Sequence, residues 1–168
     1  SINGYFKKEL DMKSLIIFLL LGLAVYYGWN KFSSPTAPTE AESVYVEFRV
    51  KFPDDIELVG FGRMDSMEDC EQRSEIFWGN VLASGNNAKM SPTKCGIKLS
   101  PRYQALFANK VSTATYLSFD RGNAGERDGR FIIYGVPSSQ VMSECPAIIA
   151  KFKENYTGEV KCVQGTVG

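Results

Sequence analysis

Histidine is absent from the 168 residues of this chain. Without an imidazole, the sequence excludes Ser-His-Asp and Cys-His nucleophiles, histidine-ligated zinc and a histidine pH switch. The formal net charge is zero, so the overall charge does not favour nucleic acid as a partner. A P-loop, a G-x-G-x-x-G after a strand and a G-x-S-x-G are also absent. We therefore expect no cofactor, no metal and no common hydrolytic mechanism.

One long apolar run is present near the N-terminus, within residues 14–32. It carries no charge from Ser14 to Asn30, is flanked by lysines and ends in aromatic residues suited to a membrane interface. We expect a transmembrane anchor that stays uncleaved, because no small-x-small cleavage site follows the run. A cleaved signal peptide is the alternative, since a basic start before an apolar core also fits that pattern.

The charges beside the anchor predict its orientation. Three lysines precede it within residues 1–13, whereas Lys31 alone follows it before the next segment. Positive charge stays on the cytoplasmic side of a membrane, so residues 1–13 are expected in the cytoplasm. The chain is then a single-pass protein of the inner membrane whose C-terminal domain is periplasmic. Residues 1–11 precede Met12, a candidate initiator, and are given no role in the fold.

Two regions follow the anchor. Residues 33–43 are rich in Ser, Thr, Pro and Ala without a large apolar side chain, which predicts an extended linker. Residues 44–168 are long enough for one globular domain. This domain opens with strict alternation over residues 44–52, which is typical of a half-buried strand. Its polar face is expected to meet water or a partner and consists of Tyr45, Glu47, Arg49 and Lys51.

Further cap, turn and periodicity signals predict the other elements of the domain. After a loop that contains Gly60 and Gly62, they are a helix from Ser66 to Gly85, a strand over 93–99, a short helix over 100–110, strands over 114–120 and 130–136, a helix over 138–156 and a strand over 159–165. This order predicts an α+β domain behind the N-terminal transmembrane helix. The expected fold is a ferredoxin-like split β-α-β sandwich, with an antiparallel sheet and helices on one face.

The chain has four cysteines, and each half of the domain holds two of them. In each half the first cysteine lies early in a helix and the second lies in the following strand. A helix packed against its own succeeding strand brings these positions together, which favours bridges Cys70–Cys95 and Cys145–Cys162. Such disulfides fit an oxidising compartment. Free core thiols are the main alternative, whereas redox or metal roles lack a C-x-x-C or a paired knuckle.

A charged loop over residues 120–130 is the strongest candidate for a binding site. Among its glycines it concentrates carboxylates and guanidinium groups that suit recognition of a charged partner, namely Asp120, Arg121, Arg127, Asp128 and Arg130. The competing interpretation is a solvated hairpin tip whose opposite charges satisfy one another. No nucleophile with an adjacent base is present in it.

Three hypotheses for function follow. The first is a non-enzymatic binding module at the membrane surface, with another envelope protein as its partner, serving in an envelope or secretion assembly or as a toxin-immunity protein. The second is a glycan-binding envelope domain. An anchor, a polar linker and a duplicated β-α-β unit are similar in architecture to the SPOR family, which binds peptidoglycan, although this chain is longer and lacks a matching motif. The third is an enzyme that uses the carboxylates of Asp54, Asp55 and Glu57, a spacing that is more typical of a polar turn.

Overall fold

The computed structural model describes residues 43–83 and 88–166. Its centre is one six-stranded antiparallel sheet in the order β3-β1-β2-β5-β4-β6. The strands are β1 (Val44–Lys51), β2 (Glu57–Met64), β3 (Lys89–Gly96), β4 (Tyr116–Asp120), β5 (Asp128–Tyr134) and β6 (Glu159–Val163). The helices are α2 (Met67–Ala83), α3 (Pro101–Phe107) and α4 (Ser138–Phe152), with a short 3-10 turn η1 (Pro53–Asp55) between β1 and β2. The α+β class and the antiparallel sheet are confirmed.

The domain is built from two units that share the order β-β-α-β. Strands β2 and β3 both run antiparallel to β1, so they are parallel to each other with β1 between them, and β5 and β6 flank β4 in the same way. Helices α2 and α4 therefore each make a split β-α-β connection, whereas α3 links the two units. A ferredoxin-like sandwich has the order β-α-β-β-α-β, and this chain differs by placing an additional strand before each unit.

The strand register relates the two units by a pseudo-twofold axis. Val46 pairs with Gly62 and Cys95, and Leu117 pairs in the same way with Phe131 and Cys162. Matching these positions makes Phe61 equivalent to Arg130. These two residues pair with each other where β2 meets β5, so the axis passes between them. The two units thus join at the centre of the sheet, and each disulfide lies in an outer strand.

Strand β2 corrects the expectation of a loop between the first strand and the first helix. Its glycines were interpreted as loop residues, but the strand is buried over most of its length. A Cβ on Gly60 would overlap the ring of Phe48, its cross-strand partner in β1. Gly60 is therefore a strand residue that leaves room for an aromatic ring. Strand β3 likewise begins at Lys89, earlier than the predicted 93–99.

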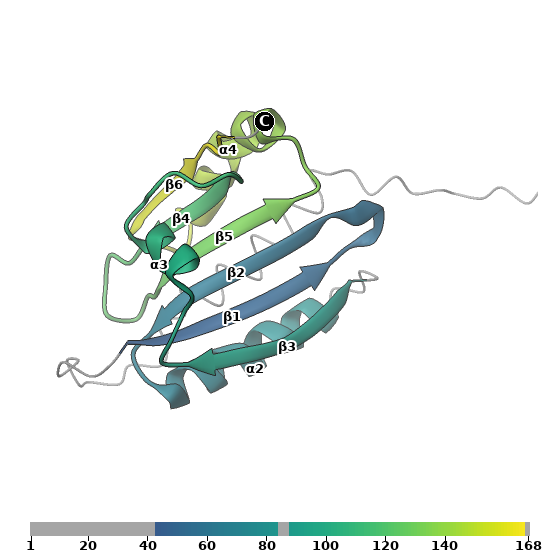
Figure 1. Cartoon of the computed structure of the whole chain (residues 1–168). Coiled ribbons are helices and arrows are strands. Elements are labelled where there is room, and N and C mark those ends of the chain that lie inside the picture. Colours follow the sequence, from purple (N-terminus) through teal and green to yellow (C-terminus); the bar gives the residue numbers. More distant parts are fainter. Residues whose placement is uncertain (1–42, 84–87, 167–168) are drawn as a thin grey trace, which may run out of the picture.

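Apolar side chains fill both sides of the sheet. On one side, α2 packs over β1, β2 and β3, and α4 packs over β4 and β6, with Phe77, Ile148 and Phe152 among their buried residues. On the other side, the shorter α3 covers a second cluster that includes Phe61 and Tyr116. Figure 1 shows α3 in front of the sheet and the two long helices behind it. The expectation of helices on one face holds for α2 and α4, whereas α3 lies on the opposite face.

Both predicted disulfides are confirmed. Cys70 in α2 is bonded to Cys95 in β3, and Cys145 in α4 is bonded to Cys162 in β6. The Cα atoms of the two pairs lie 6.1 and 6.2 Å apart. Each bridge ties a helix to the outer strand of its own unit, which is the geometry that the sequence spacing indicates.

The predicted transmembrane anchor at residues 14–32 lies outside the described residues, as do most of the linker and the N-terminal segment. Within 43–83 and 88–166, no helix combines the length and the apolar character needed to cross a bilayer.

Candidate functional site

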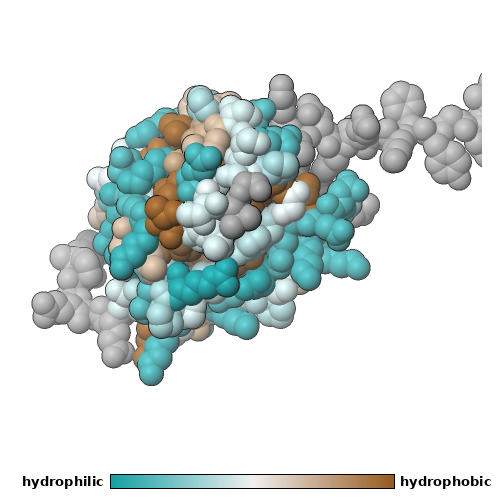
Figure 2. Space-filling model, turned by 45° about the horizontal axis from the view of Figure 1, so that its top comes forward, coloured by the Kyte–Doolittle hydropathy of each residue, from teal (hydrophilic) through white to brown (hydrophobic). Residues whose placement is uncertain are grey.

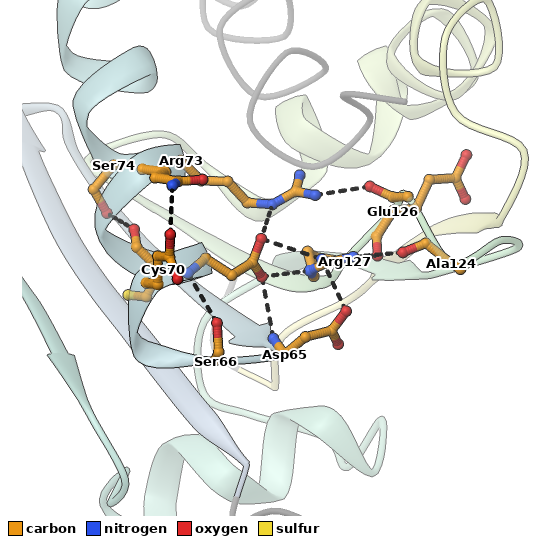
Figure 3. Close-up of polar contacts among 12 residues, drawn as sticks. Asp65, Ser66, Cys70, Arg73, Ser74, Ala124, Glu126 and Arg127 are labelled. Atoms are coloured by element: carbon orange, nitrogen blue, oxygen red, sulfur yellow. Dashed lines mark hydrogen bonds and ion pairs between the residues drawn. The ribbon is translucent and has the colours of Figure 1, made fainter. Parts of the chain in front are cut away.

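The charged loop predicted as a binding site is held against the start of α2. Arg127 Nε donates to Asp69 Oδ2 at 2.6 Å, and Arg127 Nη2 lies 2.8 Å from Asp65 Oδ2. Arg73, one turn further along α2, donates to Asp69 Oδ1 at 2.8 Å. Asp69 also belongs to the helix cap, because its own N–H donates to Ser66 Oγ. Figure 3 shows Asp65, Arg73 and Arg127 converging between the helix and the loop.

Glu126 anchors the same loop from within. Its side chain is fully buried, and its carboxylate accepts hydrogen bonds from the backbone N–H groups of Gly122, Thr157 and Gly158. Such a buried carboxylate is stable only when its oxygens are satisfied in this way. The loop is therefore fastened to the turn after α4 as well as to α2.

The guanidinium groups of Arg127 and Arg130 are used inside the domain. Arg127 is 4% exposed and also donates to the carbonyls of Ala124 and Glu126. Arg130 is fully buried beneath α3, where it bonds backbone carbonyls and the carboxylate of Asp120. The structure thus shows these two arginines as internal partners, the arrangement expected of a self-satisfied hairpin.

The other three predicted residues lie nearer to solvent. Arg121 bonds Asp65 at 2.9 Å, and its side chain is 35% exposed. Asp128 accepts from the backbone of Arg121 and pairs with Arg63. Asp120 Oδ1 accepts a hydrogen bond from Arg130 Nη2 at 2.6 Å, and the Asp120 side chain is 35% exposed. Sequence reasoning found the charged residues of the loop, but it missed Asp65 and Asp69, which lie far away in the sequence and complete the network.

Acid is expected to weaken this network through Asp69. Burial acts to raise the pKa of Asp69, but the hydrogen bonds and charges of Arg127 and Arg73 outweigh it and hold the pKa below its ordinary value. A carboxyl with a lower pKa in the folded chain stabilises the fold above about pH 4, and this contribution is lost as the pH falls through the folded value. Between pH 7 and pH 3, the free energy of unfolding measured in urea should therefore fall more steeply in the wild type than in Asp69→Asn. Asp54→Asn at an exposed position is the control for the loss of one carboxylate. If the free energy of unfolding depended on pH equally in the wild type and in Asp69→Asn, the role of Asp69 would be contradicted.

A different surface gathers partly exposed aromatic side chains and basic side chains on the α3 side of the sheet. Four residues follow one row across neighbouring strands, in the order Lys89, Lys51, Glu57 and Tyr134. Strand spacing makes this row about 14 Å long. They face the α3 side because the alternate residues of β1 point into the α2 and α4 core. The end of the sheet opposite the charged loop therefore presents a polar row.

Residues from β1 and α3 extend this row into a surface. Arg49 Nη2 donates to the hydroxyl of Tyr103 at 3.4 Å, and Arg49 Nη1 lies 3.6 Å from Oε1 of Glu57. The guanidinium of Arg102 lies over the Tyr103 ring, 5.7 Å from its centroid. Partial burial raises the pKa of the Tyr134 hydroxyl, which stays protonated at neutral pH and can donate a hydrogen bond. We call this the α3-side surface, and it comprises Arg49, Lys51, Glu57, Lys89, Arg102, Tyr103 and Tyr134.

The α3-side surface is supported from below by packed rings. Tyr103 stacks on Phe61 with their ring centroids 4.2 Å apart. Its ring is thus fixed by the core, whereas the side chain remains partly exposed. On the face that Figure 2 shows, hydrophilic residues cover much of the surface and hydrophobic residues form separate areas. A partner on this side would meet rigid aromatic rings among charges instead of a broad apolar patch.

The remaining carboxylates singled out in the sequence do not lie together. Asp54 and Asp55 occupy the exposed turn between β1 and β2, both with positive φ, whereas Glu57 lies on the α3-side surface beside Arg49. Among the described residues, no three His, Cys, Asp or Glu side chains are grouped so that they could hold a metal ion. The chain matches no known family model, no curated protein and no solved structure. The functional interpretation therefore rests on the residues themselves.

Proposed function

We propose that the chain is a non-enzymatic, membrane-anchored binding module that holds its domain outside the cytoplasm and recognises another envelope protein through the α3-side surface. The observation that carries the proposal is the composition of this surface. Tyrosine and arginine are enriched where proteins contact one another, because their side chains combine apolar area with hydrogen-bonding groups. Tyr103, Tyr134, Arg49 and Arg102 occupy one face of the domain, where the Tyr103 ring is packed on Phe61.

The remaining features support a location outside the cytoplasm. Two disulfides are typical of proteins in oxidising compartments. The apolar run at residues 14–32 and the lysines before it favour a single inner-membrane anchor with the domain in the periplasm. A rigid domain on such an anchor suits an accessory of an envelope or secretion assembly, or a toxin-immunity protein. None of these roles requires catalytic residues.

Photo-crosslinking in the native membrane tests the proposal. A photoreactive phenylalanine analogue placed at Lys51 or Tyr134 of the full chain should yield covalent protein adducts. The same analogue at Ala150, which is exposed on α4 on the other side of the sheet, is the matched control and should yield few. Adducts from Ala150 but none from the α3-side surface would contradict the proposal.

Glycan binding is the second candidate. The partly exposed rings of Tyr103 and Tyr134 beside the carboxylate of Glu57 favour it, since sugars stack on aromatic rings and bond carboxylates. Co-sedimentation with purified peptidoglycan sacculi separates the two candidates. Sedimentation of the wild type that is lost in Tyr134→Ala, together with absent protein adducts, would favour the glycan.

A further inference from the structure

We infer that the partner segment recognised by the α3-side surface is acidic, which rests on the proposed function and adds the chemistry of the partner. The surface as defined carries four cationic side chains and one carboxylate, that of Glu57. Lys51, Lys89 and Arg102 are exposed, and within the described part of the chain they form no ion pair. Lys94 continues the set, because it pairs with Glu47 in the β1–β3 ladder and is also exposed.

The carboxylates within and beside the surface are already engaged. Glu47 and Glu57 both lie against Arg49, with Nε to Oε1 at 3.2 Å and Nη1 to Oε1 at 3.6 Å. Arg49 thus has two carboxylate partners within the domain, and among the described residues neither Glu47 nor Glu57 forms an ion pair with a lysine of this surface. The charge that remains for a partner is positive, carried by Lys51, Lys89, Lys94 and Arg102.

The charged loop shows the opposite situation. Arg121, Arg127 and Arg130 each have a carboxylate partner within 3 Å, so this end of the domain satisfies its own charge. The cationic side chains without an ion pair among the described residues therefore include Lys51, Lys89 and Lys94 on the α3 side, where Lys89 pairs with Lys51 and Lys94 pairs with Glu47 in the β1–β3 ladder. Complementary potentials guide association and select partners, which makes a segment rich in Asp and Glu the fitting occupant.

The edge strand indicates how such a segment would lie. Strand β3 contains Pro92, which has no N–H to donate, and its pairing with β1 shifts register between Glu47 and Arg49. Proline, irregular register and edge lysines are features that prevent another strand from adding to a sheet. An acidic segment is accordingly expected to cross the face over Lys51 and Tyr134, where carboxylates meet the lysines and side chains meet the rings.

Selection from short random peptides displayed on phage tests the inference with the full chain in detergent micelles. Enriched peptides should be rich in Asp and Glu, and their affinity should fall as salt screens the charges. They should bind the variant Lys51→Glu/Lys89→Glu about tenfold more weakly than the wild type. The variant Lys151→Glu/Lys153→Glu on and beside α4 has the same change in net charge and should bind as the wild type does. Thermal melting of both variants verifies that they fold.

The outcomes distinguish the two proposals. Enriched peptides that lack acidic residues but depend on Tyr134 would overturn the acidic partner and leave the protein-binding module standing. Acidic peptides that bind both charge-reversal variants equally would also overturn it, because the attraction would then not come from this surface. No enrichment at all, together with binding to sacculi, would overturn the protein-binding function itself.

Discussion

Replacing Arg130 by methionine is expected to lower the free energy of unfolding by about 3–5 kcal/mol, because it removes one partner of a buried ionic network. The guanidinium makes five hydrogen bonds, to the carbonyls of Leu106, Phe107, Phe119 and Gly129 and to the Asp120 carboxylate. Methionine fills a similar volume but donates nothing. Buried acceptors without donors then carry their full desolvation cost.

Urea unfolding of the Arg130 variant measures this loss, and two further variants separate its causes. Arg130→Lys keeps the charge but not the planar fork, so most of the loss should remain. Arg121→Met removes an exposed arginine with a single carboxylate partner and should change stability by about 1 kcal/mol or less. Equal losses at Arg121 and Arg130 would show that burial and hydrogen bonding do not distinguish the two residues.

The effect of Arg130 should also reach the α3-side surface. Leu106 and Phe107 end α3, and helix C-termini leave carbonyls without partners within the helix. Arg130 supplies those partners from β5 and so fastens the helix that carries Tyr103 to the sheet. Hydrogen exchange in the methionine variant should therefore rise in α3 before it rises in α2, whose contacts lie on the other side of the sheet.

Much of the fold could be predicted because its local signals are short-range. Alternation in β1 and the Ser66 cap of α2 act over a few residues, and the cysteine spacing acts within one helix and its following strand. Each of these predictions is confirmed. Strand β2 escaped prediction because Gly60 resembles a loop residue in sequence. Position 60 requires glycine because the ring of Phe48 occupies the space that a side chain would need. Only the β1–β2 register, which pairs Phe48 with Gly60, shows this.

The candidate site was harder to predict for the same reason. The sequence shows the charges of residues 120–130, but whether a guanidinium is free or occupied depends on residues far along the chain. Asp69 lies 58 positions from Arg127, and Leu106 lies 24 positions from Arg130. The α3-side surface combines residues from β1, β2, β3, β5 and α3, so no contiguous sequence motif predicts it. A signal did exist in the polar face of β1, where Arg49 and Lys51 were expected to meet water or a partner.

Removing either disulfide is expected to lower the free energy of unfolding by about 3 kcal/mol, and removing both by about 6 kcal/mol. The bridges close loops with sequence separations of 25 and 17 residues, for which the chain-entropy estimates are similar. Their effects should add because the two disulfides lie on β3 and β6, the strands at opposite edges of the sheet, about 24 Å apart by strand spacing. The double loss approaches the whole stability of many domains of this size.

The measurement is urea unfolding of Cys70→Ala/Cys95→Ala, Cys145→Ala/Cys162→Ala and their combination. Alanine is preferred to serine because Cys70 is fully buried, where a hydroxyl would lack a partner. Wild-type protein unfolded in a reducing agent keeps all side chains and so isolates the crosslinks from the cavities that alanine leaves. Mass spectrometry of protein taken unreduced from its native membrane should find both bridges formed. Free thiols in that sample would contradict the location proposed outside the cytoplasm, whereas intact bridges that add nothing to stability would contradict their structural role.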